Sequence, residues 1–473
     1  MYKKNAPDRG WLFLLHASLA IVLLVFASEV KAQSSAKTVL KVGVIGDQTG
    51  SADIDKSYDV LRRGVDILSK ENVKCVLHTG DLVESNVSPE KYRARFDEAA
   101  ALLDHLGKPW SLAPGDHDVN PPFPPFVPDS ADRSREKLFY ELYRRRVPHL
   151  TTTLNHSFDI DGYHFIALNS QEHLSTDPRW GDIFLNKISA DQITWLKNDL
   201  AKSHASKGII VFIHQPMWYN WSNWTPVHEL LRSHRALAVI AGHFHYDQDE
   251  GEIDGIRYFV VGAAGGSVKQ ASRDAGNVQH VTVVTIQGRK VGFRLIPIDG
   301  AEPLHATPRA DMDRVQAIDV LLGELFGFGS DNSVCVKDNH LFNQNMGPAK
   351  LSLIPVGNPI DQPVKLSLQL LSDKIDLRNS QFMPGACQQV TPDGQCILAP
   401  GTRVESSNNS LVVLNNRFAP LPPVWESGLD VKPGSTVAPG DAIQLRVRLS
   451  FEGVQGRHFV EGTAAVTIKA CSP

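Results

Sequence analysis

The chain has 473 residues, more than one hydrophobic core usually serves, so we expect two or three domains. Hydrophobic residues make up 42% of it, which supports ordinary globular packing, and 48 Lys and Arg against 52 Asp and Glu leave a net charge of -4. This balance argues against nucleic acid or an anionic membrane surface as a partner, because both attract strongly basic proteins. We expect a small or locally recognised partner; the oligomeric state is not readable.

Residues 1–32 have the pattern of a signal peptide. Basic residues near the start precede an apolar stretch from Gly10 to Ser28 that holds no Asp, Glu, Lys or Arg. Small or apolar residues then allow cleavage after Ala32, which predicts a mature start at Gln33. The alternative interpretation is an uncleaved membrane anchor. With cleavage no stable membrane span remains, and we expect a secreted or periplasmic protein.

Residues 38–300 alternate short β-branched runs with amphipathic helical stretches, which predicts an α/β domain with covered sheets. The first two strands are expected in KVGVI and VKCVLHT, each followed by a helical stretch. Further runs with strand character are YHFIALNS, GIIVFIH, LAVIAG, RYFVVGAA and VTVVTI, and SADQITWLKNDLAKS has helical periodicity. The domain is therefore expected to be large and layered.

The character of the chain changes beyond residue 300. Residues 301–332 contain the helix-like run VQAIDVLLGELFGF and are expected to form a helical connector. From 333 to 473, short alternating runs are separated by Pro, Gly and Asn clusters, which is typical of a β-sandwich-like domain. We therefore expect a smaller, all-β C-terminal domain.

Four of the five cysteines lie in the last third of the chain, where an oxidising compartment would pair them. Pairing Cys387 with Cys396, and Cys335 with Cys471, is plausible, but the sequence leaves three connectivities open. Cys75 stands apart in an apolar run and is expected to be a buried, inert thiol.

Side chains that bind metals follow several of the expected strands. The loops at the carboxyl ends of strands in layered α/β folds meet at one crevice, so ligands distant in sequence meet there in space. Carboxylates and imidazoles are the donors that hard or borderline divalent ions prefer. The residues in question are Asp47, Asp81, Asp116, His214, His243 and His245.

These motifs resemble those of the calcineurin-like metallophosphoesterases, which show an Asp-x-His, a Gly-Asp, a Gly-Asn-His-Asp/Glu, an isolated His and a Gly-His-x-His in this order. The resemblance covers about Leu40 to Ile298 and implies a layered β-sandwich flanked by helices. The matching segments are Asp47-Gln48-Thr49, Gly80-Asp81, Gly115-Asp116-His117-Asp118, His214 and Gly242-His243-Phe244-His245.

The resemblance also implies two divalent metal ions, with Mn, Fe or Zn the leading candidates, and in-line attack on a phosphate ester by a bridging hydroxide. Asp81 would be shared, since a common carboxylate offsets the repulsion between two cations. Position by position, Asp47 and His245 would hold one ion, and Asp116, His214 and His243 the other.

His117 matches the family histidine that faces the leaving group, and Asp118 beside it is expected to orient the imidazole and raise its pKa. Together they form a candidate general acid. The alternative is that His117 only hydrogen-bonds a loop backbone. His78, which lies inside a strand, is expected to be structural.

Two positions depart from the family pattern. Thr49 stands where the family has a histidine ligand, and a hydroxyl is a much weaker ligand, so the first metal site is expected to bind loosely. Asp116 replaces the family's Asn and adds a negative charge, which strengthens cation binding but lowers the Lewis acidity felt by the substrate. Bound metal alone would therefore not prove catalysis.

The segment between His214 and His228 is crowded with aromatic residues: Trp218, Tyr219, Trp221 and Trp224. Such a loop either walls a pocket, where its rings stack on a base, a sugar or an apolar leaving group, or forms a local hydrophobic cluster that holds the loop. The sequence does not decide between these interpretations.

The leading hypothesis is an exported metal-dependent phosphoesterase that acts on small phosphomono- or phosphodiesters. An alternative is a catalytically impaired metal- or ligand-binding protein on the same fold, motivated by Thr49 and Asp116. A third hypothesis places the main function in the β-domain, as an adhesion module, although no feature of that domain supports it directly.

Overall fold

The computed structural model describes residues 39–51, 53–84, 86–120, 133–172, 175–176, 184–185, 187–203, 207–219, 224–268, 275–327, 334–343, 345–353, 358–382, 387–400, 406–407, 411–414, 417–419, 425–454 and 456–471. The predicted signal peptide lies outside this set. Within the described ranges, no helix combines the length and the apolar character needed to cross a membrane.

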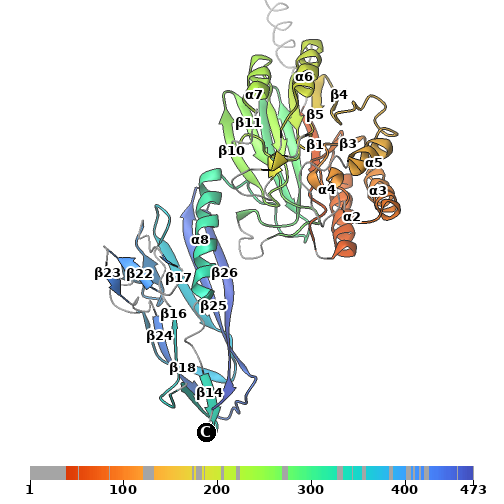
Figure 1. The fold of residues 1–473 in the computed structure, drawn as a ribbon. Coiled ribbons are helices and arrows are strands. Elements are labelled where there is room, and N and C mark those ends of the chain that lie inside the picture. The colour runs from red at the N-terminus through yellow and green to blue at the C-terminus, as the bar shows by residue number, and fades with distance from the viewer. Residues whose placement is uncertain are drawn as a thin grey trace, which may run out of the picture.

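Two mixed β-sheets form the N-terminal unit (Figure 1). The strands of the first sheet are β1 (Leu40–Ile45), β2 (Val76–His78), β3 (Trp110–Leu112), β12 (His280–Gln287) and β13 (Lys290–Pro297). They follow the order β13-β12-β1-β2-β3, with β1, β2 and β3 parallel and the other two antiparallel to their neighbours. The parallel strands therefore end at one edge of the sheet.

The second sheet has the same mixed character. Its strands are β4 (His156–Ile160), β5 (Tyr163–Ala167), β8 (Gly208–Phe212), β9 (Ala238–Ala241), β10 (Gln248–Ile253) and β11 (Ile256–Val260). In the order β10-β11-β9-β8-β5-β4, the four central strands run parallel and the two outer strands are antiparallel. A separate pair is β6 (Ser175–Thr176) with β7 (Phe184–Leu185).

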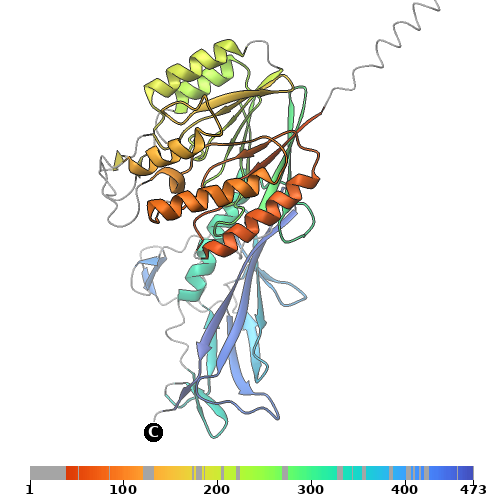
Figure 2. The ribbon, with the colours of Figure 1, turned by 90° about the vertical axis from the view of Figure 1, so that its right-hand side faces the viewer.

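The two sheets face each other and helices cover their outer faces (Figure 2). The covering helices are α2 (Ile54–Lys70), α3 (Pro89–Asp104) and α5 (Ser134–Tyr143) over the first sheet, and α6 (Ala190–Lys202) and α7 (Trp224–Ser233) over the second. Between the sheets, residues such as Val42 and Leu77 pack against Phe165 and Phe212. This arrangement confirms the predicted layered α/β architecture.

Local sequence explains where the main helices begin. The side chain of Asp53 accepts a hydrogen bond from the backbone N–H of Lys56 at the start of α2. Ser88 and Ser189 cap α3 and α6 in the same way, and Pro89 occupies the first turn of α3, where a missing N–H costs nothing.

The C-terminal unit is built from short sheets and one helix, α8 (Arg309–Gly327). Its strands are β14 (Val334–Lys337), β15 (His340–Asn343), β16 (Lys350–Leu353), β17 (Val364–Leu370), β18 (Ile375–Phe382), β19 (Gln389–Val390), β20 (Cys396–Leu398), β21 (Ser406–Ser407), β22 (Leu411–Leu414), β23 (Arg417–Ala419), β24 (Trp425–Val431), β25 (Ala442–Gly453), β26 (Gly456–Thr467) and β27 (Lys469–Ala470). The main sheets have the orders β19-β20-β17-β25-β26 and β16-β24-β18. The all-β character predicted beyond the helix is confirmed.

Helix α8 packs into the core of this unit. Met312, Val315 and Ile318 belong to the same buried cluster as Val447 on β25 and Val460 on β26. Figure 1 shows the helix lying along these long strands with its first turns beside the N-terminal unit. The segment predicted as a connector therefore also contributes core side chains and reaches both units.

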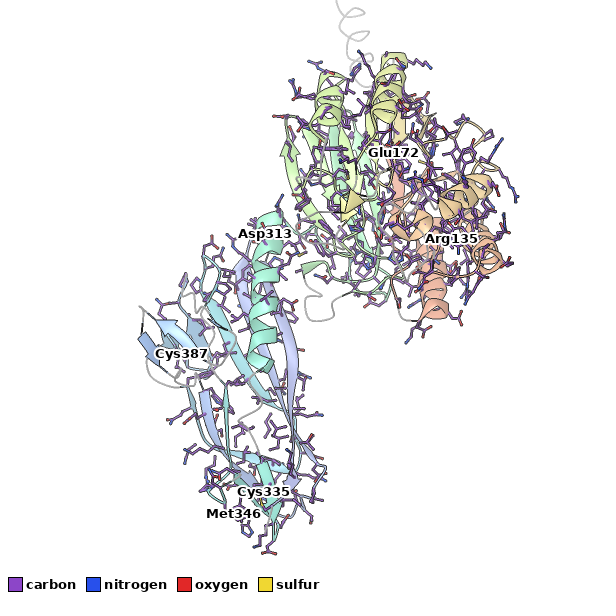
Figure 3. The ribbon with its side chains drawn as sticks, viewed as in Figure 1. Arg135, Glu172, Asp313, Cys335, Met346 and Cys387 are labelled. Atoms are coloured by element: carbon purple, nitrogen blue, oxygen red, sulfur yellow. A yellow bond between two sulfur atoms is a disulfide. The ribbon has the colours of Figure 1, made fainter. Side chains whose placement is uncertain are left out.

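The four C-terminal cysteines form two disulfides, Cys335–Cys471 and Cys387–Cys396. Cys335 lies at the far end of the C-terminal unit, whereas Cys387 lies closer to its middle (Figure 3). Of the three possible connectivities, the structure selects the predicted pairs. Cys75 is a free thiol and is fully buried, as predicted, and burial raises its pKa to about 12, which disfavours the reactive thiolate.

Candidate metal centre

The six candidate ligands lie in the short segments that follow buried strands, or open the next element. Asp47 follows β1, Asp81 follows β2, Asp116 begins α4 (Asp116–Val119) after β3, His214 follows β8, and His243 and His245 follow β9. Four of them have left-handed backbones: Asp47 (φ 51°), Asp81 (60°), His243 (73°) and His245 (61°). Outside exposed turns, a non-glycine residue keeps this conformation where its surroundings impose it, and such residues concentrate at functional sites.

Backbone contacts impose these turns. The N–H of Asp47 donates to the carbonyl of Gly80 (3.0 Å), and the N–H of Gly242 donates to the carbonyl of His214 (2.8 Å). A Cβ at Gly242 would collide with the Asp47 carboxylate. Glycine at this position therefore allows the two sheets to bring their ligands together.

The side chains of the six residues converge. Asp116 Oδ1 lies 2.8 Å from His214 Nε2 and 3.1 Å from His243 Nδ1. His214 Nε2 lies 3.4 Å from Asp81 Oδ2, and His245 Nε2 lies 3.9 Å from Asp47 Oδ1. Three overlapping groups each have one donor atom per residue within 4.8 Å: Asp116 with His214 and His243; Asp47 with Asp81 and His214; Asp81 with Asp116 and His117.

Two backbone carbonyls set the orientation of the histidine rings. His214 Nδ1–H donates to the carbonyl of Thr79 (2.9 Å), and His245 Nδ1–H donates to the carbonyl of Ser267 (2.7 Å). A ring that donates through Nδ1 offers the lone pair of Nε2 to a metal. Both rings therefore have the tautomer that a ligand requires.

The site has a buried floor and a more accessible rim. The side chains of Asp47 and His214 are fully buried, and that of Asp81 is 2% exposed, whereas that of His243 is 28% exposed. Asp47 Oδ1 accepts from the N–H of His243 (2.7 Å), but its Oδ2 is buried without a hydrogen-bond partner among the described residues. A buried carboxylate oxygen without a partner is costly unless a cation binds it.

The carboxylates of Asp47, Asp81 and Asp116 make the site strongly negative, which favours bound cations or protonated histidines. Burial lowers the pKa of His214, but Asp81, Asp116 and Asp47 outweigh this and hold it well above its ordinary value. Burial raises the pKa of Asp47, while His214 and His245 act in the opposite direction. Three clustered carboxylates with imidazole donors therefore fit divalent metal ions.

His117 stands beside these residues with a different partner from the one predicted. Its Nδ1 lies 2.9 Å from Glu84 Oε2, and its side chain is 32% exposed. Burial lowers the pKa of His117, but Asp81, Glu84 and Asp116 raise it to about 10. Glu84 was missed at the sequence level, although a carboxylate three residues after Asp81 in the same loop was the available signal.

Asp118 faces the backbone instead of the His117 ring, so the predicted orienting role is corrected. Asp118 Oδ2 accepts from the N–H groups of Asp81 and Gly115, and Oδ1 accepts from the N–H of Val83, each at 2.9 Å. Because the loop after β2 and the start of α4 both need these bonds, Asp118 is a positioning residue for Asp81. The carboxylate that contacts the His117 ring is that of Glu84, and not that of Asp118 as predicted.

The family model of the calcineurin-like phosphoesterases matches residues 40–247, which contain all six candidate ligands. Residues 40–247 form a calcineurin-like phosphoesterase domain. A comparison with curated proteins found no match. The sheets of the phosphoesterase domain continue past the matched residues, since β12 and β13 complete the first sheet.

Several solved structures are similar to the chain. A dimetal phosphatase from Danio rerio has a TM-score of 0.43 and 17% identity, with 57% of this chain and 98% of that chain covered. GAP50, the anchor in the inner membrane complex of Plasmodium, has a TM-score of 0.35 and 13% identity, with 57% and 89% covered. A 5'-nucleotidase from Candida albicans has a TM-score of 0.34 and 14% identity, with 55% and 52% covered.

Thr49, which departs from the family pattern, and His78, which was expected to be structural, are both buried. Thr49 is 8% exposed, and its Oγ1 has no hydrogen-bond partner within the described part of the chain. His78 is fully buried, its Nδ1 accepts from the N–H of Gly80 (3.2 Å), and burial lowers its pKa to about 3. A neutral His78 that supports the turn before Asp81 agrees with the structural role predicted for it.

The aromatic residues between His214 and His228 fit different interpretations: two belong to a local hydrophobic cluster, and one lies beside the candidate metal site. Trp218 and Trp224 pack around Tyr258 in the cluster that carries α7, with ring centroids 4.9 and 6.4 Å from it, as a structural cluster would. Tyr219 instead lies against Phe244 in the His243–His245 turn, with centroids 5.3 Å apart. Trp221 lies outside the described residues.

Proposed function

We propose that the protein is an exported, metal-dependent phosphoesterase that hydrolyses small phosphomono- or phosphodiesters with two divalent ions. The observation that carries this proposal is the overlap of the three donor groups, in which Asp81, Asp116 and His214 each belong to two. A single ion would need only one such group. Overlapping groups with shared members suit two neighbouring ions.

The ligand assignment follows the family pattern and is supported by the contacts. Asp81 would be the shared ligand, since its Oδ2 lies 3.4 Å from His214 and its Oδ1 accepts from the N–H of His117 (2.9 Å). Asp47 and His245 would hold one ion; Asp116, His214 and His243 would hold the other. Oxygen and nitrogen donors without sulfur suit Mn, Fe or Zn.

The ions, when bound, supply an activated water and stabilise charge on the phosphoryl oxygens. The chain itself supplies the proton for the leaving group. His117 has its Nδ1 held by Glu84, so its Nε2 is available to donate a proton to the departing oxygen. The fully buried Asp118 holds the loop of Asp81 in place through three backbone bonds.

Export is supported by the two disulfides, because oxidising compartments are where such bonds persist. The apolar pattern of residues 1–32 supports it independently.

The test is hydrolysis of paired chromogenic mono- and diesters by the purified protein, with and without added Mn²⁺. We expect turnover that needs the metal and that drops at least ~10³-fold in Asp81→Asn, because this substitution removes a charged shared ligand. The matched control is Asp59→Asn, which changes an exposed carboxylate on α2. Metal-independent turnover, or an unaffected Asp81→Asn variant, would contradict the proposal.

A second function is favoured by one observation. Thr49 occupies the place of a family imidazole ligand, and its buried hydroxyl has no hydrogen-bond partner among the described residues. A catalytically impaired binding protein on the same fold is therefore the alternative. Thr49→His discriminates between the two: a gain in turnover of more than ~10²-fold would indicate a degraded enzyme, and a small change would indicate a complete site without that ligand.

A further inference from the structure

Glu250 on β10 is a buried carboxylate that accepts hydrogen bonds from both units of the molecule. Its side chain is 2% exposed. Oε1 accepts from the indole Nε1–H of Trp218 (3.1 Å), from the hydroxyl of Tyr219 and from the amide of Gln248 (2.8 Å). Oε2 accepts from the guanidinium of Arg309 (3.3 Å), the first residue of α8. Because a buried carboxylate is costly without donors, these bonds tie α8 to the loop that follows β8.

Tyr219 is held by two further contacts. The guanidinium of Arg309 lies over its ring, with Cζ 4.3 Å from the centroid, which is a cation–π contact. The ring meets Phe244 edge to face, with centroids 5.3 Å apart. Burial and the carboxylate of Glu250 hold the pKa of Tyr219 above its ordinary value, so its hydroxyl keeps the proton that it donates to that carboxylate.

Phe244 connects these contacts to the candidate metal centre, because it stands between His243 and His245. Its ring centroid lies 6.0 Å from that of His243. Both histidines are partly buried and have left-handed backbones, a conformation that the surrounding structure must maintain at such positions. The packing of Tyr219 against Phe244 is one restraint that maintains it.

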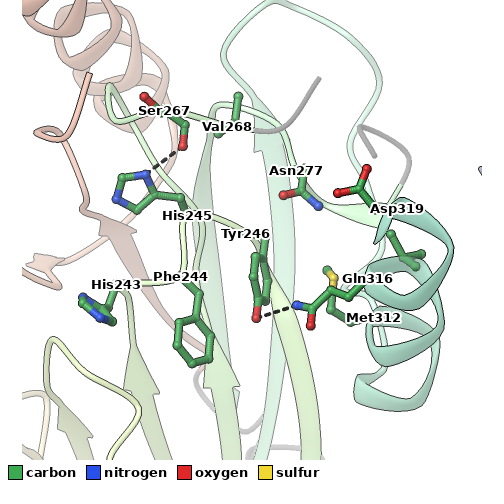
Figure 4. A pocket seen from close by; sticks show the side chains of 11 residues that line it. His243, Phe244, His245, Tyr246, Ser267, Val268, Asn277, Met312, Gln316 and Asp319 are labelled. Carbon is green, nitrogen blue, oxygen red and sulfur yellow. Dashed lines mark hydrogen bonds between the residues drawn. The ribbon is translucent and has the colours of Figure 1, made fainter. Parts of the chain in front are cut away.

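A second set of contacts joins α8 to the same region. Gln316 Nε2 donates to the hydroxyl of Tyr246 (2.9 Å), and both residues line a cavity of about 360 Å³ beside His245 (Figure 4). Just before α8, the N–H of Thr307 donates to Asp247 Oδ2 (2.7 Å). The residues that follow His245 are therefore bound to the helix and to the segment that leads into it.

We propose that Arg309 is a positioning residue for the candidate metal centre, through which the C-terminal unit holds the His243–His245 turn in the geometry that binds the ions. Arg309 acts through Glu250 and Tyr219, and Tyr219 acts through Phe244. The C-terminal unit thereby raises metal affinity, although the six candidate ligands all lie in the phosphoesterase domain. This inference rests on the metal sites of the proposed function, but not on catalysis. Because Arg309 is 46% exposed and solvent screens its charge, the expected effect is moderate.

The experiment is calorimetric titration of the chelator-stripped full chain with Mn²⁺. Arg309→Gln should raise the apparent dissociation constant about 5- to 10-fold, because the turn that carries two ligands loses part of its support. At saturating Mn²⁺, kcat should stay within about threefold of the native value. Arg309→Lys keeps a charge beside Glu250 but not the planar group over Tyr219, so its affinity should lie between the two. Unchanged affinity in Arg309→Gln would overturn the inference.

A double-mutant cycle tests whether Arg309 acts through Tyr219. Tyr219→Leu should weaken Mn²⁺ binding at least as much as Arg309→Gln does, and the double variant should bind within about twofold of Tyr219→Leu alone. Additive losses would overturn the inference. If Arg309→Gln does not fold, Arg309→Met combined with Glu250→Gln replaces it, since this pair leaves no buried charge unpaired, and it should show the same loss.

The matched control is Arg314→Gln on the same helix. Arg314 pairs with Asp311 and Asp361, which both lie in the C-terminal unit. This variant should lower the thermal stability of that unit but leave the Mn²⁺ affinity within about twofold. An equal loss of affinity in the Arg309 and Arg314 variants would mean that general destabilisation of α8 is responsible, and would overturn the inference.

Hydrolysis measured in parallel separates this inference from the proposed function. Weaker Mn²⁺ binding by Arg309→Gln, together with no hydrolysis by the native chain, would support the positioning role and overturn the catalytic function. Hydrolysis by the native chain with unchanged Mn²⁺ affinity in Arg309→Gln would overturn the positioning role alone. A native chain that binds no Mn²⁺ and hydrolyses no ester would overturn both.

Discussion

Both units of the molecule use left-handed backbone in exposed turns, but among the described residues only the phosphoesterase domain also uses it for buried residues at strand ends. In the phosphoesterase domain, Asp47 and Asp81 adopt it at fully or nearly fully buried positions at strand ends, where hydrogen bonds from neighbouring loops hold them. In the C-terminal unit, Asp338 and Asn339 adopt it in an exposed turn between β14 and β15. Exposed turns favour Asp and Asn in this conformation, whereas the surrounding fold maintains it at the buried candidate ligands.

The units also differ in how they are stabilised. The phosphoesterase domain has a core between two sheets and additional cores under its helices, and its one described cysteine is free. The C-terminal unit combines one five-stranded sheet with three-stranded ones and contains both disulfides. We therefore expect removal of a disulfide to destabilise the C-terminal unit. Substitution of a candidate metal-binding side chain is expected to lower activity in the phosphoesterase domain.

The largest effect is expected from loss of the long-range disulfide. Cys335–Cys471 closes a loop of 136 residues, so its replacement by two alanines should destabilise the C-terminal unit by roughly 5 kcal/mol. Replacement of Cys387–Cys396, with a separation of 9, should cost roughly 3 kcal/mol. Calorimetric unfolding of the two variants measures the difference. Equal losses, or an inactive phosphoesterase domain in either variant, would contradict the proposed division between the units.

The next effect concerns the buried candidate ligand Asp47. Asp47→Asn should lower hydrolysis at least ~10³-fold, because it removes a charged ligand. In chelator the same substitution should stabilise the protein by about 1 kcal/mol, because it removes a buried carboxylate oxygen without a partner. Kinetics and thermal unfolding with EDTA provide the two measurements, with Asp59→Asn as control. A less stable, still active variant would show that Asp47 is an ordinary structural residue.

A smaller effect is expected at Glu84. Glu84→Gln should reduce kcat about 10- to 100-fold for esters with poor leaving groups, since His117 loses its carboxylate partner. Esters with good leaving groups, which need little protonation, should be affected less than threefold. The control is Glu98→Gln on the exposed side of α3. An equal loss for both ester classes would mean that Glu84 acts in metal binding instead.

The smallest effect is a pH dependence of the free energy of unfolding, and it comes from His164 near the start of β5. Burial lowers the pKa of His164, but Asp199 (2.8 Å) and Asp159 (2.7 Å) raise it above its ordinary value. The stabilisation is thus fully present below the unfolded-state pKa and is lost as pH rises through the folded-state pKa.

His164→Gln tests this sign. Denaturant unfolding from pH 5 to 9 should show a deficit of about 1–2 kcal/mol relative to the native chain at low pH, which shrinks as pH rises. The control is His105→Gln, at an exposed position with no acidic hydrogen-bond partner in the described contacts. This variant should show no pH-dependent deficit relative to the native chain. A deficit that grows with pH would show that His164 is neutral in the folded protein.

Much of the fold was predictable because its signals are local. The β-branched runs at β1, β8 and β9, the serine before α6 and the loss of helical periodicity beyond α8 each appear within a few neighbouring residues. The candidate ligands were also predictable, since each stands at a strand end in a recognisable motif. The position of Glu84 after Asp81 could have marked it as a candidate, but its pairing with His117 was not predictable, because that contact joins two loops that only the parallel pairing of β2 and β3 brings together.

The sequence by itself determined the architecture of the N-terminal unit, the residue types available at its strand ends and the cysteines available for pairing, because these depend on composition and short-range pattern. Only the tertiary structure decided that Asp118 holds the backbone while Glu84 holds His117, and that α8 packs in the C-terminal core while it lines a cavity beside His245. These outcomes depend on distances between segments far apart in the chain, which side-chain packing and backbone hydrogen bonds set and local pattern does not.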